Sequence, residues 1–443
     1  MKYLLKNKDN IVLEFEVSIN TQTYQGISRQ YATIKNTKTI NDDLLPRSMN
    51  DLDSLQKWIE KRKVPKNRAF VNDILKTLSV DSDDNFMSYI DISLGLSLND
   101  SYWIVPSDRE YKWSDFNLYD NEFDKALALV AFSGGSYKAN KITSSPEYTT
   151  NGMLKKCWHR DNGEIYLYKG SSEKYANGGK ESYAEYYMAQ IAESLEFKHI
   201  SYDLKEFHGQ LVSTCPIFTN ENEGYLNIYD CLDKDIRQSY KFKLIEPIQK
   251  VYGKGSFEDL MLFDALICNV DRHLGNFGMI VDNNTNDLLH PAPIFDNGFS
   301  MINILTQDEL SDIPNAITNM QHSFFDFSFD EQLKLFVQPR HIPHLEKLQT
   351  FEFKKHKEFN LPDEWLESIQ KAIQDRAKLA IDFCHKKQSK TINADKIRAM
   401  PKPTPEERQK VRAFLDAAKQ AHNVDKAQES TQSQSKPKIR SKQ

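Results

Sequence analysis

Asp271, Asn276 and Asp296 are side chains of the types that phosphoryl transfer needs, and they lie in two short segments. Asp271 and Asn276 belong to NVDRHLGN, and Asp296 belongs to PIFDNG further along the chain. Transfer of a phosphoryl group to a hydroxyl needs one carboxylate that orients or deprotonates that hydroxyl. A nearby oxygen ligand and a second carboxylate must hold Mg²⁺ against the phosphates. The two segments supply such a set.

The elements around these segments could bring the three side chains together. The apolar stretch Phe257–Cys268 predicts a buried helix directly before the first segment. A strand at Phe277–Val281, the turn Asp282–Asp287 and a second short strand then lead to the second segment. A hairpin of this kind can return Asp296 to the loop. The alternative is that Asp271 caps a turn and that Asp-Asn-Gly is only a tight turn.

A kinase also needs a lysine on a strand, where it meets the α- and β-phosphates, and a glutamate on a helix to hold that lysine. Lys169 ends the predicted strand Glu164–Lys169, and an ammonium facing the interior there needs an acidic partner. Glu185, one turn into the amphipathic helix Glu181–Glu196, is the predicted partner. Glu181 is the second choice, because a carboxylate at a helix start can serve only as a cap. The alternative is that Lys169 is an ordinary surface lysine.

Backbone N–H donors for the phosphates are harder to identify. The chain has neither G-x-x-x-x-G-K-[ST] nor G-x-G-x-x-G, which excludes a Walker loop and the usual glycine-rich kinase loop. The segment Thr143–Gly152 is the best candidate, because its hydroxyls and its Asn-Gly turn could approach phosphate. These hydroxyls belong to Ser144, Ser145, Thr149 and Thr150. An ordinary surface loop is the alternative.

The segment Cys215–Thr219 falls where a strand-rich part of the chain gives way to a helical part. A hinge at this point would offer backbone groups to adenine, with Ile217 and Phe218 as apolar walls. Ordinary strand packing is the alternative. His273, inside NVDRHLGN, is also counted among the nucleotide-binding candidates.

Composition excludes several classes of protein. The 443 residues are 39 % hydrophobic and 11 % aromatic, which suffices for a sizeable core and excludes wholesale disorder. The formal net charge of -5 gives no global argument for nucleic-acid binding, although the tail from Lys390 is basic. Five cysteines without C-x-x-C spacing, no signal peptide and no membrane-length apolar run predict a cytoplasmic protein with reduced thiols.

Hydrophobic periodicity predicts the remaining elements. Helices are expected at Leu52–Arg62, Arg68–Leu78, Asn121–Ala131, Asp330–Val337, Pro362–His385 and around Pro405–Ala421. Further strands are expected at Ile11–Val17, Gly152–Trp158, His199–Leu204 and Leu211–Ile217. The strand Gly152–Trp158 and the strand that ends at Lys169 should form a hairpin, because an Asn-Gly pair lies between them.

Changes of pattern along the chain predict four parts. Residues 1–110 form an N-terminal α/β subdomain, and residues 111–222 form a lobe with the phosphate loop, the Lys169 strand and the Glu185 helix. Residues 223–390 form a helical lobe that carries the catalytic and metal segments. Residues 391–443 form a basic and partly disordered tail. The fold class expected from this order is α+β.

The chain resembles the HipA-like kinase family, whose C-terminal domain carries Asp-Arg-His-x-x-Asn followed by an Asp-containing metal segment. NVDRHLGN and IFDNG match these two motifs. Other segments that are similar to stand-alone members of the family are SPEYTTNGMLKKCW, IYLYKGS, FTNENEGYLNI and LGLSLNDSYWI. The likeness covers about Leu94–His385. It implies a two-lobed fold like that of protein kinases, with nucleotide in the cleft between the lobes.

The resemblance implies an ATP-dependent serine/threonine protein kinase. Within it, Asp271 would be the catalytic base, Asn276 and Asp296 the Mg²⁺ ligands, and Lys169 the lysine that binds the ATP phosphates. Members of the family often phosphorylate a serine or threonine of their own phosphate loop, which can eject the loop and switch the enzyme off. The sequence does not choose among the four loop hydroxyls named above.

Two other functions stay open. Phosphoinositide kinases carry the same core motif, so a lipid or small-molecule kinase is one alternative, and a degenerate kinase that only binds nucleotide is another. The phosphate loop lacks the short glycine-rich form of the best-known toxin members, and the N-terminal region also differs. A toxin-like growth regulator and a stand-alone effector are therefore both compatible with the chain. An antitoxin-like or regulatory partner stays open, and no direct contact with nucleic acid is expected.

Overall fold

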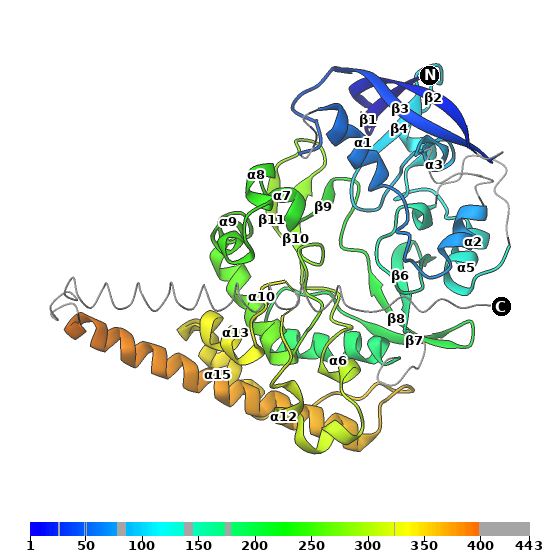
Figure 1. Cartoon of the computed structure of the whole chain (residues 1–443). Coiled ribbons are helices and arrows are strands. Elements are labelled where there is room, and N and C mark those ends of the chain that lie inside the picture. The colour runs from blue at the N-terminus through cyan, green and yellow to red at the C-terminus, as the bar shows by residue number, and fades with distance from the viewer. Residues whose placement is uncertain are drawn as a thin grey trace, which may run out of the picture. The chain divides into compact units, whose positions relative to one another are not determined.

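The computed structural model describes residues 1–24, 27–47, 49, 51–77, 86–136, 145–172, 179–322 and 324–397. Contacts divide the chain into two units, Met1–Cys384 and His385–Gln443. The sheets and the candidate site described below belong to the first unit (Figure 1). The helix expected around Pro405–Ala421 lies outside the described residues.

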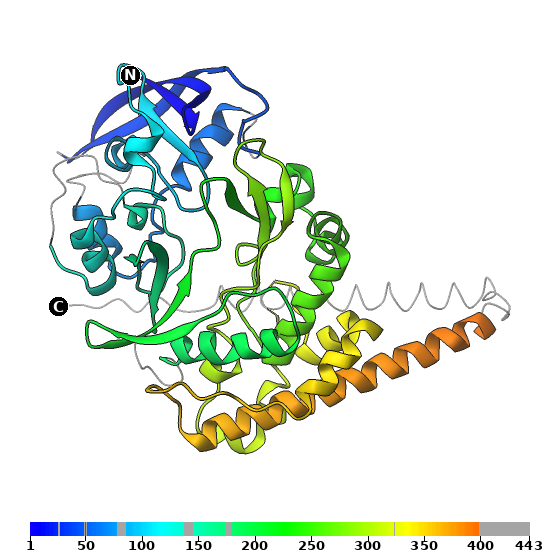
Figure 2. The same ribbon diagram turned by 180° about the vertical axis from the view of Figure 1, so that it is seen from behind.

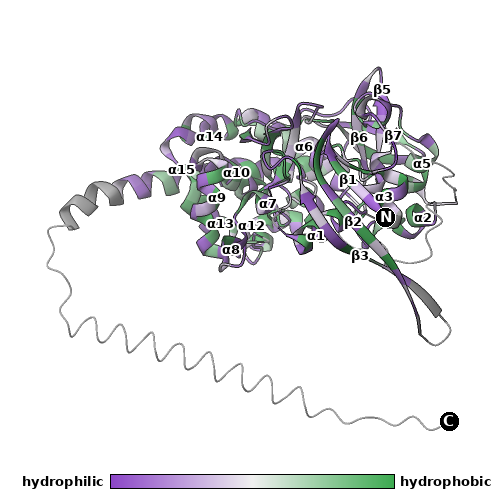
Figure 3. Ribbon diagram, turned by 90° about the horizontal axis from the view of Figure 1, so that it is seen from above, coloured by the Kyte–Doolittle hydropathy of each residue, from purple (hydrophilic) through white to green (hydrophobic). Residues whose placement is uncertain are grey.

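The first sheet combines three strands near the N-terminus with one later strand. Strands β1 (Lys2–Asn7), β2 (Asn10–Tyr24), β3 (Ile27–Thr39) and β4 (Tyr102–Pro106) pair in the antiparallel order β3-β2-β1-β4. The side chains of β1 alternate between buried and accessible, as expected when one face of a sheet covers a core. Figure 3 shows β2 and β3 extending together beyond the rest of this sheet.

The second sheet carries the predicted lysine strand. Strands β5 (Lys156–Asp161), β6 (Glu164–Gly170), β7 (Asp203–Phe207) and β8 (Gln210–Pro216) pair in the antiparallel order β5-β6-β8-β7. The predicted hairpin between β5 and β6 is confirmed. Its turn residues Asn162 and Gly163 have φ of 51° and 85°, the left-handed backbone that Asn-Gly adopts easily. Because the turn contains only these two residues, it fixes the register of β5 against β6.

The third sheet and two helices complete the surroundings of the site. Helix α6 (Glu181–Ser194) packs on β8, and the apolar helix α10 (Lys254–Ile267) belongs to the largest buried core of the molecule. Strands β9 (Glu223–Asn227), β10 (Gly278–Asp282) and β11 (Leu288–Pro291) form an antiparallel sheet in the order β11-β10-β9. Three antiparallel sheets combined with separate helical regions confirm the predicted α+β class.

Shorter helices surround these elements. They include α1 (Leu52–Glu60), α2 (Val71–Lys76), α3 (Met87–Ser93), α4 (Trp113–Phe116), α5 (Lys125–Ser133), α7 (Ile228–Cys231), α8 (Lys234–Arg237), α9 (Ile245–Tyr252), α11 (Met301–Ile304), α12 (Ile313–Ile317), α13 (Phe329–Phe336) and α14 (Ile342–Leu348). The long helix α15 spans Asp363–Ile397. Figure 2 shows the same ribbon from behind, with the N-terminal strands in blue and α13 in yellow far from them.

Several predicted boundaries were wrong by a few residues. The helix expected at Asn121–Ala131 begins at Lys125, because the Asp124 side chain accepts hydrogen bonds from the first free N–H groups of α5 and caps it. The strand expected at Gly152–Trp158 begins only at Lys156. Strands β1, β3, β4 and β9 were not predicted. Polar β3, with the sequence ISRQYATIKNTKT, gives a weak periodic signal, so only its pairing with β2 identifies it as a strand.

Candidate active site

Lys169 and Glu185 form a buried ion pair beside Asp296. The Lys169 Nζ donates to Glu185 Oε1 at 2.7 Å and also to Asp296 Oδ1. The second oxygen of Glu185, Oε2, accepts from the backbone N of Asn297 at 2.7 Å. Glu185 thus holds both the lysine and the backbone of the metal segment. This is the arrangement that a kinase lysine and its helix glutamate require.

Glu181, the second candidate for the partner of the lysine, lies elsewhere. Its carboxylate accepts from the Ser172 hydroxyl and from the backbone N of Gly179 at 3.1 Å. It therefore binds the chain just before α6. Of the two acids, Glu185 contacts Lys169 and Glu181 does not accept a hydrogen bond from it among the described contacts.

Arg272 connects the two predicted segments from inside the protein. Its guanidinium is 1 % exposed and pairs with the buried carboxylate of Asp264 on α10, with Nε to Oδ2 at 3.0 Å. Its Nη1 donates to the carbonyl oxygens of Asn276, at 3.0 Å, and Phe295. Its Nη2 donates to Asn297 Oδ1 at 2.9 Å. One side chain thus fixes the loop that contains Asn276 to the segment that contains Asp296.

The loop after α10 is held by short-range hydrogen bonds. Helix α10 ends at Cys268, whose φ of 52° turns the chain away from the helix axis. Asn269 donates from Nδ2 to Asp264 Oδ1 at 3.1 Å and accepts from the backbone N of Asp271 at 3.0 Å. Asn276 donates from Nδ2 to the Asp271 carbonyl at 2.9 Å. Since the amide nitrogen of Asn276 is used in this way, its side-chain oxygen is left for a ligand.

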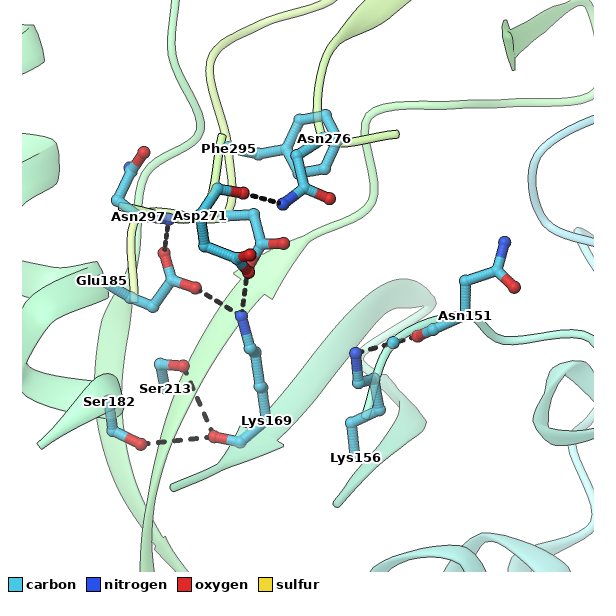
Figure 4. Close-up of polar contacts among 12 residues, drawn as sticks. Asn151, Lys156, Lys169, Ser182, Glu185, Ser213, Asp271, Asn276, Phe295 and Asn297 are labelled. Carbon is cyan, nitrogen blue, oxygen red and sulfur yellow. Dashed lines mark hydrogen bonds and ion pairs between the residues drawn. The ribbon is translucent and has the colours of Figure 1, made fainter. Parts of the chain in front are cut away.

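Asp271 and Asp296 experience each other's charge, and they differ in protonation behaviour. Burial alone raises the pKa of Asp296, but the positive charges of Lys169 and Lys156 outweigh burial and hold this pKa well below its usual range. Burial and the negative charge of Asp296 raise the pKa of Asp271. Asp296 therefore stays ionised, whereas Asp271 is a stronger base than an exposed carboxylate. Figure 4 shows Asp271, Asn276, Lys169 and Glu185 converging on one region.

A cavity of about 1020 Å³ opens at this cluster. Its walls include nine of the predicted site residues: Lys169, Glu185, Asp296, Asn276, His273, Ile217, Phe218, Thr149 and Thr150. Of the predicted residues that the structure describes, Asp271 and Ser145 do not line it. The cavity is large enough for a nucleotide.

The predicted hinge lies at the wall of the cavity. Strand β8 ends at Pro216, and the next two residues, Ile217 and Phe218, line the cavity. The Phe218 ring packs against the ring of Phe295 with centroids 5.4 Å apart. The backbone N of Ile217 donates to the Ile165 carbonyl at 2.9 Å, so it is occupied by the sheet.

The predicted phosphate loop is turned toward the protein interior. The Thr149 hydroxyl donates to the Leu96 carbonyl at 2.8 Å, and the Thr150 hydroxyl donates to the backbone of its own loop at 2.7 Å. Ser145 is 2 % exposed, and its hydroxyl has no hydrogen-bond partner in the part of the chain that the structure describes. Ser144 lies outside the described residues.

Three residues of the site were not identified from the sequence. Arg272 lies inside NVDRHLGN, but no role was predicted for this residue. Lys156 could have been found, because the two-residue turn of the predicted hairpin places it directly opposite Lys169. Arg68 gave no signal, because its contacts are remote in sequence: its Nη2 donates to the Lys156 carbonyl at 2.5 Å and its Nη1 to the Gly152 carbonyl at 3.5 Å.

The residues present fit a magnesium ion. Asp296 is an ionised carboxylate. Among the described residues, none donates a hydrogen bond to the side-chain oxygen of Asn276, whose Nδ2 is already used. Hard oxygen ligands of this kind suit Mg²⁺. Among the described residues no three His, Cys, Asp or Glu side chains gather as a metal site. A magnesium ion that is completed by water and phosphate oxygens needs no such group.

Comparisons with known proteins give matches in structure alone. No family model matches the sequence, and no curated protein matches it either. The chain is similar to the Helicobacter pylori proinflammatory kinase CtkA, with 20 % identity and a TM-score of 0.42 over 55 % of this chain and 93 % of that chain. It is also similar to HipA of a Shewanella oneidensis toxin–antitoxin system, solved with HipB and operator DNA.

The match to HipA has 13 % identity and a TM-score of 0.49, and it covers 85 % of this chain and 96 % of that chain. Among the described residues no helix is long and apolar enough to cross a bilayer. Both TM-scores are modest, and the chemistry of the site follows from its own side chains. HipA and a kinase are thus among the structures to which this chain is similar.

Proposed function

We propose that the chain is an ATP- and Mg²⁺-dependent kinase that transfers the γ-phosphoryl group of ATP to a serine or threonine hydroxyl of a protein. One observation carries the proposal: Lys169 is held between Glu185 and Asp296 at the wall of a cavity that Asn276 also lines. A buried lysine, its glutamate, a metal carboxylate and a metal amide are the groups that phosphoryl transfer requires.

The proposed reaction uses these groups as follows. The hydroxyl oxygen of the acceptor bonds to the γ-phosphorus, the bond from that phosphorus to the β–γ bridging oxygen breaks, and ADP leaves. Asp271 orients the hydroxyl and takes its proton. Lys169 holds the phosphates, and Glu185 fixes Lys169. Magnesium held by Asn276 and Asp296 would neutralise charge on the phosphates when bound.

Self-phosphorylation in the phosphate loop is part of the proposal. Its support is that Thr149 and Thr150 line the same cavity. Both hydroxyls bind backbone carbonyls, so phosphorylation of either must be accompanied by movement of the loop. A cytoplasmic location and a role as a toxin-like regulator or effector, with or without an antitoxin-like partner, complete the proposal. The free cysteines of the described residues agree with that location.

The test is transfer from γ-labelled ATP with Mg²⁺ and purified protein. Label on the protein itself, or on proteins of an added extract, supports the proposal. Label that appears only in lipid vesicles would assign a lipid kinase, and ATP binding without any transfer would assign a nucleotide-binding module. Either of the last two outcomes overturns the assignment of a protein substrate.

Substitution separates the roles of the two aspartates from general damage. Asp271→Ala or Asp296→Ala should lower transfer by at least ~10²-fold, the scale of losing a general base or a metal ligand. Asp287→Ala is the matched control, because Asp287 is an exposed aspartate on the same hairpin and should leave transfer unchanged. Near-normal transfer by Asp271→Ala or Asp296→Ala would refute the roles given to them.

A further inference from the structure

A second lysine faces the nucleotide cavity beside Lys169. Lys156 begins β5, and the register of the sheet pairs it directly with Lys169 on β6. Directly opposed residues of an antiparallel pair point to the same face of the sheet. Both lysines line the cavity, and Lys156 is only 8 % exposed. Two cationic side chains are therefore presented to the same space.

The two ammonium groups have different partners. Lys169 has carboxylates on both sides, from Glu185 and Asp296. Among the described residues Lys156 has no ion pair within 4.0 Å, and its Nζ donates to the carbonyl oxygen of Asn151 at 2.9 Å. Burial, and then the charges of Lys169 and Arg68, lower the pKa of Lys156 to about 7. A buried cation without a direct ion pair is costly, and an incoming anion that contacts it would lower that cost.

Gly152 makes the space that Lys156 occupies. A Cβ at this position would lie 2.3 Å from the Lys156 Nζ, and the φ of Gly152 is +93°. Any side chain at 152 would therefore displace the ammonium as well as strain the backbone. In Figure 4, the Lys156 ammonium lies against the backbone carbonyl of Asn151, and Lys169 stands on the neighbouring strand.

We propose that Lys156, seated against the Gly152 backbone, is a second phosphate-binding residue that recognises the polyphosphate of a nucleoside triphosphate. The inference rests on the proposed function and deepens it. The chain has neither of the two glycine-rich motifs, G-x-x-x-x-G-K-[ST] and G-x-G-x-x-G, whose backbone N–H groups surround phosphates. A lysine ammonium supplies the charge-assisted hydrogen bonds that such a loop would otherwise provide. Arg68 positions this residue through its bond to the Lys156 carbonyl.

The test measures binding of a non-hydrolysable ATP analogue and of adenosine by calorimetry. Lys156→Met should weaken binding of the ATP analogue by about 10- to 100-fold, the scale of one lost charge-assisted hydrogen bond, and leave adenosine binding unchanged. Lys155→Met is the matched control, because the neighbouring Lys155 binds Gln210 and does not line the cavity. It should bind both ligands as the unmodified chain does.

A substitution of Gly152 gives a second, independent test of the role of Lys156, because the lysine itself is unchanged. Gly152→Ala should also weaken the ATP analogue selectively, because its Cβ displaces the ammonium. Gly163→Ala is its control: Gly163 has a similar φ of +85°, and a Cβ there would meet nothing within 4 Å. Backbone strain is thus similar in both variants, and only Gly152→Ala disturbs Lys156.

The outcomes separate this inference from the proposed function. If the unmodified chain binds no ATP analogue, the proposed function fails. If it binds the analogue and Lys169→Met weakens binding, but Lys156→Met and Gly152→Ala do not, then the role of Lys156 alone is overturned. Equal weakening of adenosine and ATP analogue by Lys156→Met would show a structural lysine and would overturn the inference as well. Thermal unfolding of each variant identifies any that fails to fold. If Lys156→Met does not fold, the binding measured for Gly152→Ala decides whether Lys156 binds phosphate.

Discussion

Two buried arginines, Arg272 and Arg68, each hold one loop of the candidate active site, and they do so to different degrees. Arg272 is matched by the Asp264 carboxylate and donates to three acceptors in the catalytic and metal segments. Arg68 donates to the Gly152 carbonyl in the phosphate loop and to the Lys156 carbonyl at the start of β5, and its Nε has no hydrogen-bond partner among the described residues. The catalytic loop is therefore the more completely bonded of the two.

The carboxylates near the two arginines also differ in how completely they are hydrogen-bonded. Asp264 contacts Arg272 directly. Glu147, in the phosphate loop, accepts from the Trp158 backbone N at 2.8 Å, but its Oε2 has no partner among the described residues. Buried polar groups without hydrogen-bond partners destabilise the folded state. Opening the phosphate loop should therefore cost less free energy than opening the catalytic loop. A loop that must release and rebind nucleotide benefits from this difference.

The largest expected effect follows from removing the better-bonded arginine. Arg272→Met leaves Asp264 fully buried without its cationic partner, which should lower the free energy of unfolding by about 3–5 kcal/mol and abolish transfer. Chemical denaturation and the transfer assay measure the two effects. The double variant Arg272→Met with Asp264→Asn should recover part of the stability, because the orphaned charge is gone. A loss below about 1 kcal/mol in the single variant would contradict the comparison.

A pH-dependent effect is expected at Glu147. Burial raises the pKa of this carboxyl from 4.5 to about 7, so the folded state holds its proton more tightly than the unfolded state. The contribution of the Glu147 carboxyl to the free energy of unfolding is fully present below about pH 4.5 and is lost as the pH rises through about 7. Glu147→Gln should therefore match the unmodified chain at low pH and exceed its free energy of unfolding by about 3 kcal/mol at pH 8.

Denaturation of both proteins across this pH range checks the effect at Glu147. Glu206→Gln, on the exposed surface of β7, controls for loss of a surface charge. A constant difference between Glu147→Gln and the unmodified chain at all pH values would show that Glu147 is not held in the way described. The control variant is measured over the same pH range and in the same buffer, so that differences in the screening of charges by salt do not affect the comparison.

The smallest effect is expected for Arg68. Arg68→Met should cost about 1–3 kcal/mol of unfolding free energy, because the buried hydrogen bond to the Lys156 carbonyl and the part-buried one to the Gly152 carbonyl are lost while Glu147 can neutralise itself by protonation. Binding of an ATP analogue should also weaken, since Lys156 loses the group that positions its backbone. Denaturation and calorimetry measure these effects. A cost equal to that of Arg272→Met would remove the distinction between the two loops.

Local sequence information was sufficient for the elements that depend on neighbouring residues. The Asn162–Gly163 turn selects a hairpin and thereby its register, and the periodicity of α6 placed Glu185 on the face that meets Lys169. Asp271 and Asn276 could be recognised because both come from one short loop, in which the Asn276 side chain binds the Asp271 carbonyl.

Tertiary structure alone decided which buried groups hold the loops and how well they are satisfied. Arg68 reaches Lys156 across 88 positions of sequence, and Thr149 reaches Leu96 across 53. No local propensity encodes such contacts, because they exist only after apolar surfaces have brought remote segments together and excluded water. The sequence by itself determined the chemical types available for phosphoryl transfer. Burial in the folded chain decided their charges, since desolvation and neighbouring charges exist only there.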